Sequence, residues 1–157
     1  MTVESKAAFR AARERCGISQ QMLASKAGVK VLSVKRWEKP GEAETPADVR
    51  AWLGHMLDLH IQAVESALNA VDEMTETQGH APSHVDLLYY RSQEHYDRYG
   101  RDQGDYAIVN ARSREIAAIL EAQGIEARFR YPEDDEAALP TFGEHSLKTH
   151  LLLTGPL

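Results

Sequence analysis

The segment that most constrains this chain is residues 18–41, which read ISQQMLASKAGVKVLSVKRWEKPG. Ser19 can cap the start of a helix through its hydroxyl. Gly28 suits a tight turn, because a left-handed backbone is readily adopted only without a side chain. Val34 and Trp37 are three residues apart and therefore share the buried face of a second helix. The spacing predicts two short helices joined by a glycine turn.

The same segment carries a family resemblance. The residues that match are Gln20, Ala24, Gly28, Val29, Val34, Trp37 and Glu38. With them the chain resembles the lambda-repressor/Cro-like (Xre) family of helix–turn–helix regulators, over residues 5–41. The resemblance implies an all-helical DNA-binding domain whose second motif helix, residues 30–39, enters the major groove. A looser resemblance, resting on layout, is to small dimeric autorepressors associated with anti-CRISPR operons.

The charge of the chain is unevenly distributed. Residues 1–41 contain nine Lys or Arg and three acidic residues, a net charge of +6, whereas the whole chain carries −6. The remaining residues therefore carry −12. A basic segment that coincides with the motif favours a polyanionic partner for that segment, and the acidic remainder is repelled from the same partner.

Family position assigns roles to side chains of the second motif helix. Val31, Leu32 and Arg36 are expected to face the base edges, and the Arg36 guanidinium can bind O6 and N7 of a guanine together. Val31 and Leu32 are apolar where the family usually has polar residues, so they pack either on thymine methyl groups or on another part of this protein. Phosphate contacts, which position a protein without reading sequence, are expected from Gln20, Lys26, Lys30, Ser33, Lys35 and Lys39.

A first helix is expected from about Glu4 to Cys16, because Phe9 and Cys16 fall on one face at helical spacing. The resemblance also implies that Arg13 on this helix pairs with Glu38. Such an ion pair would tie the first helix to the second motif helix in a structural role.

A long helix is expected after the motif. Pro46 at its first position starts it, and no breaker except Gly54 follows before about Thr77. Its apolar residues run close to a heptad pattern. The candidates for a dimerisation seam are Leu57, Ile61, Val64, Leu68 and Val71. The competing interpretation is a long helix that packs only on its own chain.

The C-terminal part predicts a small β–α–β unit. Residues 85–90 and 125–131 have strand patterns, and residues 93–99 and 106–123 have helical ones. Two strands alone make no stable sheet, so the unit needs the long helix, the C-terminal tail or a second subunit as a partner. Pairing across a two-fold axis is the preferred interpretation. The run 133–136 is acidic and typical of a solvated loop, and residues 150–154 form a last strand or a frayed tail.

Other features bound the function. No apolar run is long enough for a membrane span, and the N-terminus lacks the apolar core of a signal peptide. The only cysteine, Cys16, can form no internal disulfide, which fits a cytoplasmic protein. The seven histidines have no metal-ligand spacing, and no P-loop or nucleophile motif is present. We therefore expect neither an enzyme nor a metal or other cofactor.

These observations predict an α+β protein. Residues 1–77 would form the DNA-binding region with its connector helix, and residues 85–157 a dimerisation or sensing module. The expected function is sequence-specific binding of duplex DNA by a homodimeric repressor, with its own operon as the expected target. One alternative is an antitoxin-like protein whose C-terminal part neutralises a partner protein. Another is a ligand-responsive regulator whose pocket is lined by Tyr89, Tyr90, His95, Tyr96, Arg98 and Tyr99, although such aromatic residues more often cover an interface.

Overall fold

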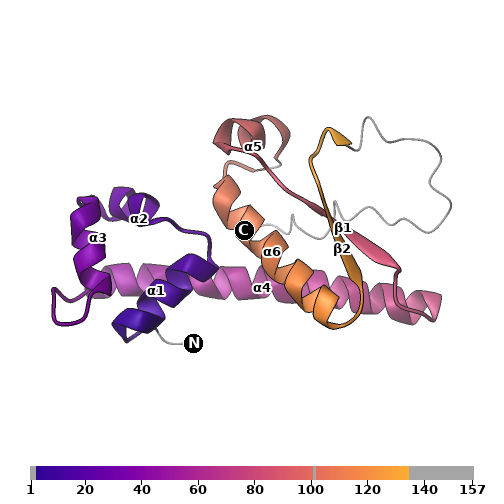
Figure 1. Cartoon of the computed structure of the whole chain (residues 1–157), viewed down its shortest axis with the longest axis horizontal. Coiled ribbons are helices and arrows are strands. Elements are labelled where there is room, and N and C mark those ends of the chain that lie inside the picture. Colours follow the sequence, from indigo (N-terminus) through magenta and orange to yellow (C-terminus); the bar gives the residue numbers. More distant parts are fainter. Residues whose placement is uncertain (1–2, 101, 135–157) are drawn as a thin grey trace. The chain divides into compact units, whose positions relative to one another are not determined.

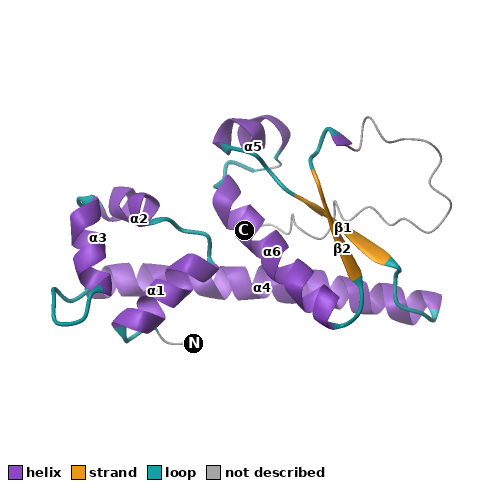
Figure 2. Cartoon of the chain, viewed as in Figure 1, coloured by secondary structure: helices purple, strands orange, loops and turns teal. Residues whose placement is uncertain are grey.

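The computed structural model describes residues 3–100 and 102–134, which form a helix-rich α+β chain (Figure 2). The helices are α1 (Lys6–Arg15), α2 (Gln20–Ala27), α3 (Val31–Glu38), α4 (Ala47–Gln78), α5 (Gln93–Tyr99) and α6 (Tyr106–Ala122), and the strands are β1 (His84–Leu88) and β2 (Glu126–Arg130). None of these helices is both long enough and apolar enough to cross a membrane. The strand expected at 150–154 lies outside the described residues, as does the second half of the acidic run, residues 135 and 136.

The chain forms two compact units that divide within α4, one up to Ile61 and one from Gln62. The sequence had placed the boundary after the helix, at residue 77. The difference arises because the second half of α4 contributes Val64, Ala67 and Val71 to the core of the second unit. A continuous helical pattern does not reveal that its two halves pack on different partners.

In the first unit, α1, α2 and α3 gather around the first half of α4 (Figure 1). Ser19 caps α2 by accepting a hydrogen bond of 3.0 Å from the backbone N–H of Met22. Gly28 ends α2 with a left-handed backbone, φ 67°. These two residues behave as predicted, and they fix where α2 begins and where the chain turns toward α3.

The core of this unit combines apolar residues from all four helices. Its most deeply buried side chains include Phe9, Leu23, Val34, Leu53 and Leu57. The long helix begins one residue after Pro46, whose carbonyl accepts a hydrogen bond from the Arg50 N–H, and its bounds agree with the predicted ones.

In the second unit, β1 and β2 pair in parallel, with Val85 beside Ala127 and Leu87 beside Phe129. The chain between them contains α5 and α6, as the β–α–β prediction requires. The buried core is formed by residues of α4, α6 and the strands: Val64, Ala67, Val71, Val85, Leu87, Ile116, Ala117, Leu120 and Ile125. The long helix is thus one partner that the two strands needed. Pairing of strands across a two-fold axis stays a prediction.

The long helix does not carry the predicted dimerisation seam on its surface. Leu57 is fully buried within the single chain, and Val64 and Val71 are 4% and 2% exposed. Leu68 packs against the second unit's core, and only Ile61 lies outside these cores in a half-buried position. Within the single chain the cores therefore cover most of the seam, and its role in a dimer stays a prediction. The competing interpretation of the heptad pattern fits these positions.

The polar side chains of α6 extend the bonding of β1 beyond its last residue. Asn110 accepts a hydrogen bond of 2.9 Å from the Tyr90 N–H and donates one of 2.7 Å to the Tyr90 carbonyl. Ser113 donates to the Leu88 carbonyl at 2.9 Å. All three bonds are buried, so α6 satisfies backbone groups that a neighbouring strand would otherwise satisfy.

Candidate nucleic-acid interface

One side of helix α3 packs against the rest of the first unit. Val34 is fully buried and Trp37 is 6% exposed. Lys6, on α1, donates to the Trp37 carbonyl at 3.1 Å and to the Ala43 carbonyl at 2.6 Å. A lysine that binds carbonyls at a helix C-terminus is favourably placed in the field of the helix. This role of Lys6 was not predicted from the sequence, because nothing in the sequence except its position at the start of α1 points to it.

The predicted ion pair between Arg13 and Glu38 is present in the structure. Arg13 Nε lies 2.5 Å from Glu38 Oε1, and Arg13 Nη2 lies 3.1 Å from Glu38 Oε2. Arg13 Nη1 also donates to the Ile18 carbonyl at 2.8 Å, and Gln20 Nε2 donates to Glu38 Oε2 at 2.9 Å. One carboxylate therefore connects α1, α2 and α3, which fixes the orientation of α3.

The environment of Glu38 keeps it ionised. Burial acts to raise the pKa of its carboxyl, but the hydrogen bonds from Arg13 and Gln20 and the charges of Arg13 and Arg10 outweigh burial, so the pKa lies below its usual value. The charge of this acid is balanced inside the unit. It therefore does not offset the cations on the exposed side of α3.

The three expected base-reading residues lie on or near the exposed side of α3. Leu32 is 55% exposed and Val31 is half-buried, so α3 leaves most of Leu32 uncovered within the part of the chain described here. The Arg36 side chain is 57% exposed, and its Nε lies 3.7 Å from Glu42 Oε2. An apolar residue and a guanidinium are thus presented together, one turn apart on the helix.

The six expected phosphate-binding residues divide into three groups. Lys30, at the N-terminus of α3, and Lys35 are exposed, and Ser33 is half-buried. Lys39 Nζ lies 2.9 Å from Glu42 Oε1.

Gln20 and Lys26 have partners within the unit. Gln20 Nε2 uses one of its two hydrogens on Glu38, which leaves the second for another acceptor. The Lys26 ammonium lies 5.7 Å from the ring centre of Trp52. Both side chains therefore have a partner within the protein in addition to any contact with solvent.

Glu42 is an acidic neighbour of α3 that sequence reasoning missed. Its carboxylate lies between Arg36 and Lys39, and the hydrogen bond from Lys39 is the largest of the effects that lower its pKa. Glu42 follows Pro40-Gly41 in a turn, and no pattern in the sequence predicts that an acid at this position faces Arg36 and Lys39.

Among the described residues, no group of three His, Cys, Asp or Glu side chains is arranged to hold a metal ion. One side of α3 exposes apolar and basic side chains. The other side is buried through Val34 and Trp37 and is joined to α1 and α2 through Glu38. In comparisons with known proteins, no family model and no curated protein matches this chain.

Proposed function

We propose that this protein binds duplex DNA in a sequence-specific manner and regulates transcription, with α3 inserted in the major groove. One observation supports the proposal above the others. Leu32 and Arg36 point outward from α3, while Glu38 on the same helix is clamped by Arg13 and Gln20. A rigidly held helix with an exposed reading face is what major-groove recognition requires.

The division of labour follows from the chemistry of the side chains. Arg36 reads a guanine, because its planar guanidinium can donate to O6 and N7 together. Leu32, with Val31 beside it, contacts thymine methyl groups. The exposed lysines Lys30 and Lys35 bind phosphates and fix the register without reading bases.

The regulator acts as a homodimer that represses its own operon. Two α3 helices of such a dimer would occupy half-sites about 34 Å apart, one turn of the duplex. The net charge of −12 on residues 42–157 keeps the remainder of each subunit away from the DNA. The surface that joins the subunits lies outside the buried positions of α4.

The proposal is tested by fluorescence anisotropy on the DNA upstream of the gene and on a scrambled duplex, over a series of salt concentrations. We expect tighter binding to the upstream DNA and an affinity that falls steeply with salt. Arg36→Ala should reduce the preference between the two duplexes by about 1–3 kcal/mol, the contribution of one base position.

Arg10→Ala is the matched control, because Arg10 lies on α1, is exposed and pairs with Glu14. This variant removes the same charge from the same unit and should keep the preference. Equal affinity for both duplexes would argue against the upstream operator. Equal loss on every sequence in Arg36→Ala would argue against base reading by Arg36.

A further inference from the structure

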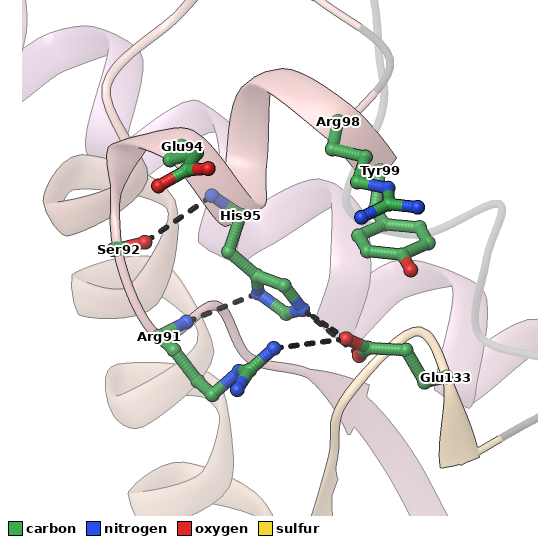
Figure 3. A pocket seen from close by; sticks show the side chains of 7 residues that line it. All are labelled: Arg91, Ser92, Glu94, His95, Arg98, Tyr99 and Glu133. Atoms are coloured by element: carbon green, nitrogen blue, oxygen red, sulfur yellow. Dashed lines mark hydrogen bonds and ion pairs between the residues drawn. The ribbon is translucent and has the colours of Figure 1, made fainter.

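The second unit contains a polar cavity of about 250 Å³ between α5 and the turn that follows β2. Figure 3 shows the side chains that line it, with His95 and Glu133 facing one another and Arg98 and Tyr99 at the far end of α5. Arg91 enters the cavity from the segment after β1. In open α/β sheets, ligands bind beyond the carboxyl ends of the parallel strands, and this cavity lies at that edge.

His95 forms the floor of the cavity and is held at both ring nitrogens. Nδ1 accepts a hydrogen bond of 3.2 Å from the Arg91 backbone N–H, so the proton of the neutral ring is on Nε2. Nε2 lies 2.8 Å from each oxygen of Glu133 and donates to that carboxylate. With both nitrogens engaged, His95 is a positioning residue here and has no lone pair directed at a ligand.

The carboxylate of Glu133 is neutralised by its own surroundings. Arg91 Nη2 lies 3.1 Å from Glu133 Oε1, beside the bond to His95. The Glu133 backbone N–H and the His95 ring lower the pKa of the Glu133 carboxyl. The carboxylate therefore stays ionised while it binds Arg91 and His95. Glu94, the other acid of the lining, lies near the start of α5, whereas Arg98 lies near its end (Figure 3).

The two arginines of the cavity each make a cation–π contact with a tyrosine. The Arg91 guanidinium lies 5.6 Å from the ring centre of Tyr131, and the Arg98 guanidinium lies 5.4 Å from that of Tyr99. Within residues 3–100 and 102–134, no carboxylate pairs with Arg98. A cation–π contact with a ring restricts a guanidinium and leaves N–H groups available for a planar anion.

We propose that this cavity binds a small molecule through a phosphate or carboxylate group. Arg98 supplies the bidentate contact. The charge of Arg91 is balanced by Glu133, so Arg91 contributes only further N–H donors, and Tyr99 covers the ligand with its ring. Glu133 and His95 hold Arg91 and α5 in place. The volume of about 250 Å³ lies just below the range of about 300–1,000 Å³ that is typical of ligand pockets, so the cavity suits only a small ligand. This binding does not depend on recognition of DNA, so the two proposals can fail separately.

The test is an NMR titration of the full ¹⁵N-labelled chain with inorganic phosphate and, separately, with acetate. Sodium chloride holds the ionic strength constant. We expect saturable shifts of the Arg98 Nε–H and of the backbone amides of residues 91–99 with at least one of the two anions. The anion that saturates identifies which group the cavity takes.

Three variants make the test specific. Arg98→Gln should weaken the saturable binding at least tenfold. Arg128→Gln should leave it unchanged, because Arg128 is an exposed arginine of β2 that pairs with Glu126. Lys30→Gln should also leave it unchanged, because Lys30 lies in the first unit. Shifts confined to the first unit, equal saturation in Arg98→Gln, or saturation with neither anion would each overturn the proposal.

Discussion

Arg13 and Glu38 form a bidentate ion pair whose side chains are only 7% and 4% exposed. The two residues are 25 positions apart in the chain and belong to α1 and α3. A buried pair of this kind contributes little net stability compared with apolar residues, but loss of one partner leaves the other charge buried and uncompensated. The pair thus controls whether α3 keeps its orientation.

Removal of one partner should destabilise the first unit strongly. We expect Arg13→Ala to lower the free energy of unfolding by about 3–5 kcal/mol, because Glu38 then remains buried without its cation. Urea denaturation followed by circular dichroism measures the loss. Arg10→Ala serves as the control, since the Arg10 side chain is 61% exposed and its ion pair with Glu14 lies on the surface, so the midpoint should change little. A similar midpoint for both variants would show that the buried pair has no structural role.

The same pair predicts a dependence of stability on pH. The pKa of Glu38 is lower in the folded chain than in the unfolded one, so its contribution is complete above about pH 4.3, the usual glutamate pKa, and is lost as the pH falls through the lowered folded value. Glu38→Gln, which keeps the shape but not the charge, should flatten this part of the stability curve. Urea titrations at a series of pH values from 3 to 7 compare the two chains. Parallel curves would mean that other carboxyls cause the acid sensitivity.

Local signals in the sequence predicted the local structure well. Ser19, Gly28 and Pro46 act through their own backbone neighbours, so their residue types were enough to place the ends of α2 and α4. The pair of Arg13 and Glu38 followed from the family resemblance.

Contacts between distant segments were not predictable in this way. The apolar stripe of α4 says that Val64 and Val71 are buried but not whether a second chain or the strands bury them. His95 and Glu133 are 38 residues apart and belong to no spacing pattern. In the sequence, His95 and Arg98 are candidates only for an alternative pocket, and Glu133 belongs to an expected acidic loop.

The burial of Leu57 in α4 leads to a prediction that distinguishes an effect on the stability of the single chain from an effect on its oligomeric state. Leu57→Ala should lower the free energy of unfolding by about 2–5 kcal/mol, because it leaves a cavity in a closed core. The folded variant should keep the oligomeric state of the original chain in sedimentation equilibrium. Leu57→Met, which conserves volume, should change both little. A variant of unchanged stability that dissociates would restore α4 as the dimer interface.

The contact of Asn110 with the Tyr90 backbone predicts a second sensitive position, in the other unit. Asn110→Ala would leave the buried N–H and carbonyl of Tyr90 without this partner. We expect a loss of about 1–3 kcal/mol for each group left unsatisfied. Thermal denaturation measures it, with Asn69→Ala on the exposed side of α4 as the control. Equal melting temperatures for the two variants would show that water replaces the amide without loss.

The position of Glu42 between Arg36 and Lys39 predicts a variant that gains affinity for DNA, if the proposed function holds. Its pKa is lowered, chiefly by the hydrogen bond from Lys39, so at neutral pH it is a negative charge that competes with phosphates for two cations of α3. Glu42→Gln should therefore tighten binding about two- to fivefold at low salt, the scale of an exposed ion pair, and the gain should shrink as salt rises.

Glu44→Gln is the matched control for this gain, because Glu44 is 79% exposed and lies near Lys6, away from Arg36. It removes the same charge and should produce a smaller gain in the same anisotropy titration. Equal gains from both variants would reduce the effect to net charge. Weaker binding by Glu42→Gln would instead mean that Glu42 holds Arg36 in the orientation that reads the base.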